Sequence, residues 1–177
     1  MQFRQRDQFP YCDHYLQHFL APDMLKQRPQ VWDAFRFFCE SDSLATDGVT
    51  YGRGPLVVIG CAPPGRQGRY WARQKTVFIH PKVALLYEQH THRQPRVWER
   101  AKEKFHWFDW MPWESTVLHE IVHWARDVGG KPEKFNDLEA GDEFEKRAYG
   151  RTIDSAATLH EESECQYDPT PPWRSAQ

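Results

Sequence analysis

Two histidines four positions apart, His119 and His123, lie in an apolar and aromatic segment, and their spacing limits what this segment can fold into. On an α-helix, residues four apart lie on the same face, one turn above each other, so both imidazoles can reach a single ion. Glu120 completes the pattern His-Glu-x-x-His, in which a glutamate can accept a proton from a zinc-bound water whose pKa the metal lowers to about 7. With nine histidines in 177 residues, composition predicts roughly 0.03 chance copies of this pattern. The segment is therefore predicted to be a helix that carries a zinc site.

The residues around this motif have the pattern of a helix with one face in the core and another face along a cleft. Apolar side chains recur at steps of three and four and predict a stripe that faces the core: Trp113, Val117, Ile121, Ala125 and Val128. On the same phase, His119, His123 and Arg126 share another stripe, which is expected to line a cleft. A Gly-Gly pair followed by a proline, within 129–132, is typical of a helix end. The alternative is a buried structural helix whose histidines bond carbonyl groups or pair with Glu120.

A catalytic zinc site normally has three protein ligands and one open position, so the two histidines need a partner. A second helix is expected over 138–149, and Glu145 on this helix is the predicted third ligand. The separation between His123 and Glu145 leaves room for a loop and a reversal of direction, and Ala148, one turn on, would allow the two helices to approach closely. Asp142 and Glu143 remain alternatives, and each of these carboxylates could equally be a surface charge.

Tyr149 follows Glu145 by about one helical turn and is a candidate for stabilising an oxyanion or for supporting a metal ligand from behind. Its hydroxyl could donate a hydrogen bond to the oxyanion that forms when water attacks a carbonyl. The alternative is a tyrosine that packs in the core or at a helix end. Three isolated histidines, for which a structural role is expected, are further candidates for donating this hydrogen bond, namely His80, His106 and His160.

The composition is that of a folded globule, since 40% of the 177 residues are apolar and 15% are aromatic. Residues 1–165 are expected to form a single domain, and the proline-rich residues 166–177 a flexible tail. An apolar run at 56–59 and a hairpin at 69–80 predict a small antiparallel sheet, while the other segments have helical periodicity. The expected fold is therefore α+β, with a mostly helical surround, a metal site on a helix and an edge strand beside the cleft.

Charge and hydropathy argue against two classes of partner. The net charge of −2 gives no electrostatic reason to bind nucleic acid, and no stretch approaches the roughly 18 apolar residues of a membrane span. The first residues lack the apolar core of a secretion signal, so export would need another machine or a larger parent chain. The four cysteines form no Cys-x-x-Cys pair and do not resemble a structural zinc site.

Three segments carry a resemblance to a known family: HEIVH, the downstream segment GDEFEKRAYG and the upstream hairpin GRYWARQKTVFIHP. Together they resemble a zincin metallopeptidase. More narrowly, they are similar to compact HExxH toxin domains that bacteria deliver through secretion systems, at the ends of type VI spike or Rhs-type proteins. The resemblance implies that His119 and His123 bind one zinc ion, with Glu120 as general base and Glu145 as third ligand. The chain departs from the aspartate-liganded branch of this family, because Lys146 stands where that aspartate would be.

The resemblance also implies peptide-bond hydrolysis and a zinc-dependent effector that is secreted or delivered into the periplasm or cytoplasm of a target cell. Its expected partners are a protein or peptide substrate, an immunity protein and a delivery protein. Three other functions stay open: an amidase that acts on cell-wall peptides, a non-catalytic binding module stabilised by zinc, and an intracellular processing protease.

Overall fold

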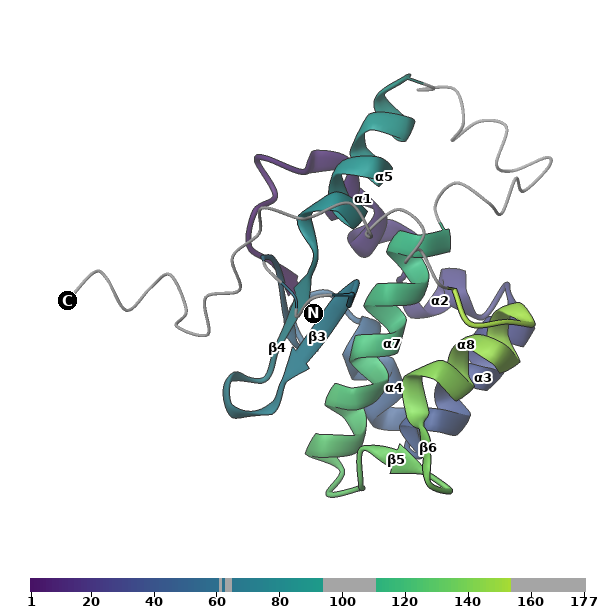
Figure 1. Ribbon diagram of the computed structural model, residues 1–177. Coiled ribbons are helices and arrows are strands. Elements are labelled where there is room, and N and C mark those ends of the chain that lie inside the picture. The colour runs from purple at the N-terminus through teal and green to yellow at the C-terminus, as the bar shows by residue number, and fades with distance from the viewer. Residues whose placement is uncertain (61, 63–64, 94–110, 154–177) are drawn as a thin grey trace.

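The computed structural model describes residues 1–60, 62, 65–93 and 111–153 (Figure 1). Its helices are α1 (Pro10–His18), α2 (Pro22–Leu25), α3 (Pro29–Cys39), α4 (Asp42–Val49), α5 (Pro81–Arg93), α7 (Met111–Val128) and α8 (Ala140–Tyr149). Its strands are β1 (Gln2–Phe3), β2 (Leu56–Ile59), β3 (Gly68–Trp71), β4 (Thr76–Ile79), β5 (Lys134–Phe135) and β6 (Leu138–Glu139). Helices α1, α2, α3 and α5 each begin at a proline, which suits the first helical turn because no N–H is needed there.

The main sheet has the strand order β1-β2-β4-β3. Strands β1 and β2 are parallel, as are β2 and β4, whereas β3 runs antiparallel to β4. The α+β class is confirmed, but the sheet is mixed where an antiparallel one was expected. The physical reason is the chain path: helices α1 to α4 return the chain from β1 to the start of β2, and β3 reverses it before β4. Strand β3 is left at an edge of the sheet.

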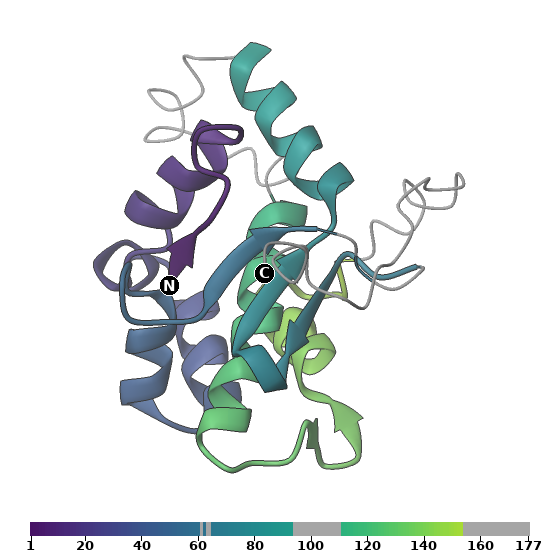
Figure 2. The ribbon, with the colours of Figure 1, turned by 90° about the vertical axis from the view of Figure 1, so that its left-hand side faces the viewer.

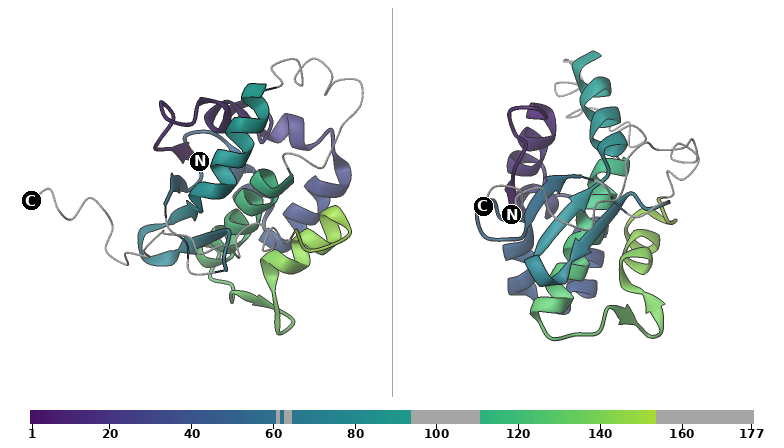
Figure 3. Two further views of the ribbon diagram at one scale, coloured as in Figure 1. Left: turned by 45° about the horizontal axis from the view of Figure 1, so that its top comes forward. Right: turned by 60° about the vertical axis from the view of Figure 1, so that its left-hand side comes forward.

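Helix α7 lies at the centre of the molecule, with the sheet packed on one side of it and α3, α4 and α8 on the other. Figures 2 and 3 show this layering, with β3 and β4 crossing in front of α7. Trp113, Val117, Ile121 and Ala125 are buried as predicted, whereas Val128 in the last turn is exposed. Helix α4 approaches α7 closely at Gly48, where a Cβ atom would lie 2.6 Å from a methyl carbon of Ile121.

No helix in the described ranges is long and apolar enough to cross a membrane. The predicted end of the domain at residue 165 and the tail 166–177 lie outside the described residues, as do His106 and His160. His80 is buried at the end of β4, where its Nδ1 accepts a hydrogen bond from the main-chain N–H of Lys82 at 3.1 Å. This bond gives His80 a structural role at the first turn of α5.

Candidate metal centre

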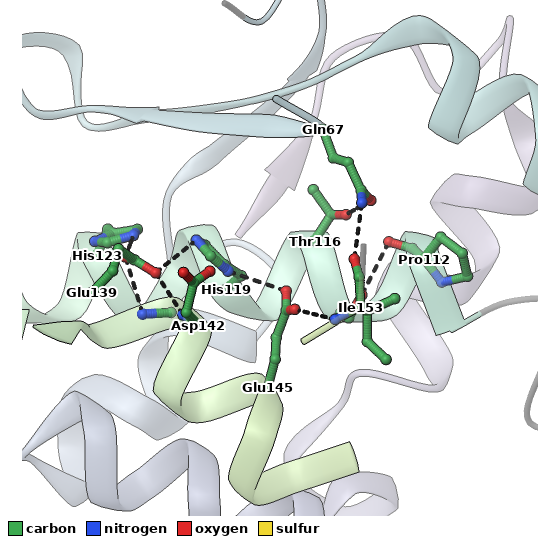
Figure 4. A network of polar contacts seen from close by, with 11 residues as sticks. Gln67, Pro112, Thr116, His119, His123, Glu139, Asp142, Glu145 and Ile153 are labelled. Carbon is green, nitrogen blue, oxygen red and sulfur yellow. Dashed lines mark hydrogen bonds and ion pairs between the residues drawn. The ribbon is translucent and has the colours of Figure 1, made fainter. Parts of the chain in front are cut away.

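The His-Glu-x-x-His motif lies on α7, as its spacing predicts. The rings of His119 and His123 lie 5.1 Å apart between centroids, because residues four apart occupy the same helical face. Figure 4 shows the two imidazoles on the side of α7 that faces α8 and the β6 strand. The helix thus presents two nitrogen donors to one region of space.

The carboxylate that meets both imidazoles belongs to Glu139, at the junction of β6 and α8. Its Oε1 lies 2.5 Å from Nε2 of His123, and its Oε2 lies 3.5 Å from Nε2 of His119. Glu139 is also the N-cap of α8, since its side chain accepts hydrogen bonds from the N–H groups of Gly141 and Asp142. The donor atoms of His119, His123 and Glu139 all lie within 4.8 Å of one another, a spacing that can hold one metal ion.

Glu145, the carboxylate expected from the sequence to be the third ligand, contacts the other nitrogen of His119. Its Oε1 lies 3.1 Å from Nδ1 of His119, and its Oε2 accepts a 2.6 Å hydrogen bond from the N–H of Ile153. When the imidazole is neutral, a buried carboxylate in this place favours the tautomer with its proton on Nδ1, so that Nε2 is the nitrogen able to bind a metal. Glu145 is therefore brought to the site, but on the side of the imidazole that faces away from Glu139.

The two alternative carboxylates are not among the three donors that lie within 4.8 Å of one another. Asp142 contacts Glu139 through both its main-chain N–H and its side chain, and Glu143 pairs with Lys146 on the surface at 2.6 Å. Glycine at position 141 lets α8 cross so close to the motif, because a Cβ atom there would lie 2.4 Å from Cδ2 and Nε2 of His119.

Glu120 is buried between α7 and the edge strand β3. The main-chain N–H of Tyr70 hydrogen-bonds its carboxylate. A Cβ atom at Gly68 would lie only 2.9 Å from Oε1 of Glu120, so a side chain at position 68 would displace the strand or the glutamate. Burial raises the pKa of Glu120, and the two histidines oppose this rise.

A cleft of about 750 Å³ opens over the motif. One wall is the hairpin segment that includes β3, and the floor is α7 with His119, Glu120 and His123. Lys131 and Glu133, which follow α7, line the cleft as well. Strand β3 is an edge strand, so no other strand of the described residues lies on its side away from β4, where the N–H of Tyr70 meets Glu120.

The charges around the two imidazoles favour a bound cation. Burial lowers the pKa of His119, but the hydrogen bond with Glu145 and the charges of Glu120 and Glu139 outweigh it and raise the pKa to about 9. Burial opposes ionisation of Glu139, yet its hydrogen bond with His123 gives it a lowered pKa. Two nitrogens and one carboxylate are a donor set that zinc binds in catalytic sites, so the residues present fit such an ion.

Tyr149 lies elsewhere, in a buried polar cluster at the start of α7. Its hydroxyl donates a 2.9 Å hydrogen bond to Glu114, which also accepts one from Tyr15 and pairs with Arg28 at 2.6 Å. Among the described residues that line the cleft, Tyr149 is absent. The geometry thus supports the alternative, structural interpretation of this tyrosine.

Two features of the site were missed in the sequence. Glu139 was counted as part of a helix over 138–149, although a strand pair precedes that helix. The sequence signal for this hairpin was the pair Asn136-Asp137, because asparagine and aspartate tolerate the positive φ angles of a two-residue hairpin turn. Both residues adopt positive φ angles between β5 and β6. Arg126, expected in the cleft, is buried instead, with 1% of its surface exposed.

Comparison with protein-family models gave a match over residues 5–150 to the family described as metallopeptidase toxin 3. The matched region includes the motif helix, Glu139 and Glu145. Comparisons with curated proteins and with solved structures gave no match. Since the matched region spans most of the chain and contains the whole donor set, the chain belongs to the metallopeptidase toxin 3 family.

Proposed function

We propose that this protein is a zinc-dependent endopeptidase that acts as a toxin on proteins of a target cell. The observation that carries the proposal is the convergence of His119, His123 and Glu139 within 4.8 Å. The two histidines and the buried Glu120 line the floor of the cleft. Family membership supports peptidase chemistry, and the donor set supports the choice of metal.

His119 and His123 would hold zinc through Nε2, and Glu139 would supply the third ligand in place of Glu145. Glu145 would fix the orientation and tautomer of His119 through Nδ1, as carboxylates often do beside metal-binding histidines. This assignment keeps His119, Glu120, His123 and Glu145 at the site and gives the ligand role of Glu145 to Glu139.

A zinc ion held there would supply Lewis-acid chemistry, polarising both water and the scissile carbonyl. Glu120 would accept the proton of the attacking water and pass it to the leaving amine. Strand β3 would bind an extended peptide along its outer edge, which would align the scissile bond along the cleft. Gly68 would leave Glu120 room beneath that strand.

The place of action is also a proposal. A toxin of this kind would be delivered into the periplasm or cytoplasm of a target cell, with a delivery protein as carrier and an immunity protein as inhibitor in the producing cell. A labelled protein substrate added to cell fractions would locate the target compartment.

The test is zinc content by plasma mass spectrometry, together with cleavage of an unfolded protein substrate. Wild-type protein and Glu120→Gln should each retain about one zinc ion, and only the wild type should cleave, because Glu120 moves a proton and binds no metal. His123→Ala and Glu139→Ala should lose zinc. Glu145→Ala should bind zinc more weakly, by about 10- to 100-fold. Full zinc retention in Glu139→Ala, with loss in Glu145→Ala, would return the ligand role to Glu145. Cleavage by the zinc-containing Glu120→Gln variant, purified free of other proteases, would refute the mechanism.

Purified cell wall serves as the contrasting substrate. Release of dye from labelled wall, with the unfolded protein left intact, would show the amidase alternative instead.

A further inference from the structure

Arg126 lies on the motif helix, yet it takes no part in the chemistry described above. Its guanidinium is buried and donates to four acceptors: Pro132 O at 2.8 Å, Phe38 O at 3.0 Å, Lys134 O at 3.2 Å and Glu40 Oε1 at 2.7 Å. The same group stands 5.6 Å from the ring centre of Phe135. A planar guanidinium can serve acceptors in several directions at once, which a lysine cannot do.

These acceptors come from two separate parts of the chain. Phe38 and Glu40 belong to the end of α3, where Glu40 adopts a left-handed conformation with φ of 53°. Pro132 and Lys134 belong to the segment that leads into β5. Lys131 adds a second tie, because its Nζ lies 3.0 Å from the other oxygen of Glu40. Arg126 therefore fastens the segment 131–134 to α7 and α3.

The fastened segment leads directly to the third donor of the metal centre. Strand β5 pairs with β6 in a tight register, Lys134 with Glu139 and Phe135 with Leu138. Only the two-residue turn at Asn136 and Asp137 separates the strands. The position of β5 thus fixes that of Glu139, whereas the two histidines are placed by α7 itself.

We propose that Arg126, with Glu40 as its partner, is a positioning residue that sets zinc affinity by holding Glu139 against His119 and His123. The proposal rests on the assignment of Glu139 as third ligand under the proposed function. It concerns the placement of one ligand and not the stability of the fold in general.

The test is a double-mutant cycle on zinc affinity, measured by competition with a chelating dye. Arg126→Met in the wild-type background should weaken zinc binding by about 10-fold or more, in the range that outer-shell partners show. In the Glu139→Ala background the same change should weaken binding by less than about 2-fold, because the ligand it positions is already gone. Arg36→Met, which removes an exposed arginine paired with Asp42, is the matched control and should leave zinc affinity unchanged.

The variants separate this proposal from the one on which it rests. Wild-type zinc affinity in Glu139→Ala would refute the ligand assignment. Weak binding in Glu139→Ala combined with normal binding in Arg126→Met would refute the positioning role alone, as would equal losses in both backgrounds.

A buried arginine can also be needed for folding, so two milder variants complete the design. Arg126→Lys keeps the charge but cannot reach all four acceptors, and it should bind zinc with an affinity between those of wild type and Arg126→Met. Glu40→Gln changes a partly exposed group and should weaken binding in the same direction, again only when Glu139 is present. Wild-type affinity in both variants, with near-ultraviolet circular dichroism showing a native fold, would overturn the proposal.

Discussion

The replacement Gly141→Ala tests how closely α8 must approach the motif helix. The added Cβ would lie 2.4 Å from Cδ2 and Nε2 of His119, whereas ordinary contact begins at 3.4 Å, so the two must separate by about 1 Å. Metal–ligand distances tolerate deviations of only about 0.2 Å. We therefore expect zinc affinity to fall by at least about 10-fold.

In the metal-free protein, Gly141→Ala should have only a small effect on the free energy of unfolding. Alanine is favoured over glycine within a helix by about 1 kcal/mol, while overpacking costs about 1 to 3 kcal/mol. The two effects partly offset each other, so the free energy of unfolding of the metal-free variant should change by no more than about 2 kcal/mol. Urea denaturation without zinc and dye competition with zinc measure the two quantities separately.

Gly150→Ala is the control, because it should lower the stability of the protein without changing its zinc affinity. Gly150 ends the same helix at φ of 78°, and no heavy atom lies within 4 Å of its Cβ position. The change should cost about 1 to 2 kcal/mol of stability through backbone strain and leave zinc affinity unaltered. Wild-type zinc affinity in Gly141→Ala would refute the claim that this crossing shapes the metal centre.

Three further predictions concern stability. Zinc should raise the melting temperature of the wild type, since a ligand at 100 times its dissociation constant stabilises by about 2.7 kcal/mol, and a strong chelator should reverse the rise; a melting curve indifferent to both would exclude a structural contribution of the metal. Glu114→Ala should lower the free energy of unfolding by about 3 to 5 kcal/mol because it leaves the mostly buried Arg28 without its carboxylate; a loss below about 1 kcal/mol in denaturant titrations would contradict this. The hydrogen bond with Lys75 lowers the pKa of Asp127 below its usual 3.8, so the ionised Asp127 should stabilise the fold above about pH 4, and this stabilisation should be lost as pH falls through the lowered pKa. The unfolding free energies of wild type and Asp127→Asn should therefore converge at low pH. A difference that stays constant with pH would contradict this prediction.

The motif helix could be predicted because its information is local. Periodicity alone places His119, Glu120 and His123 and identifies the apolar face that packs in the core. Glu145 was placed near the site by a different argument, because its separation from His123 allows a reversal of the chain and Ala148, one turn on, would let the two helices approach closely. Its role could not be predicted in this way, because that depends on where α8 crosses α7, and Gly141 sets this distance.

Glu139 and the sheet topology were harder for a related reason. Alternating apolar residues indicate a strand but do not name its partner, so the parallel pairing of β1, β2 and β4 was not foreseen. Helix boundaries are blurred by a few residues in any sequence pattern. Here a shift of two residues turned a strand residue that caps α8 into an apparent member of the first helical turn.

The donors of the proposed metal centre lie on two stretches of chain, one in α7 and one after the turn between β5 and β6. They meet only when the β5–β6 hairpin has docked against α3 and α7. In an unfolded chain His119 and His123 would still be close in sequence, but Glu139 would have no fixed position relative to them. The three donors would then rarely come together around one ion. Formation of the complete centre is therefore linked to the final docking step of folding. Catalytic competence should appear late when the chain refolds, after most helical structure has formed, and a partly folded chain should be harmless to its surroundings.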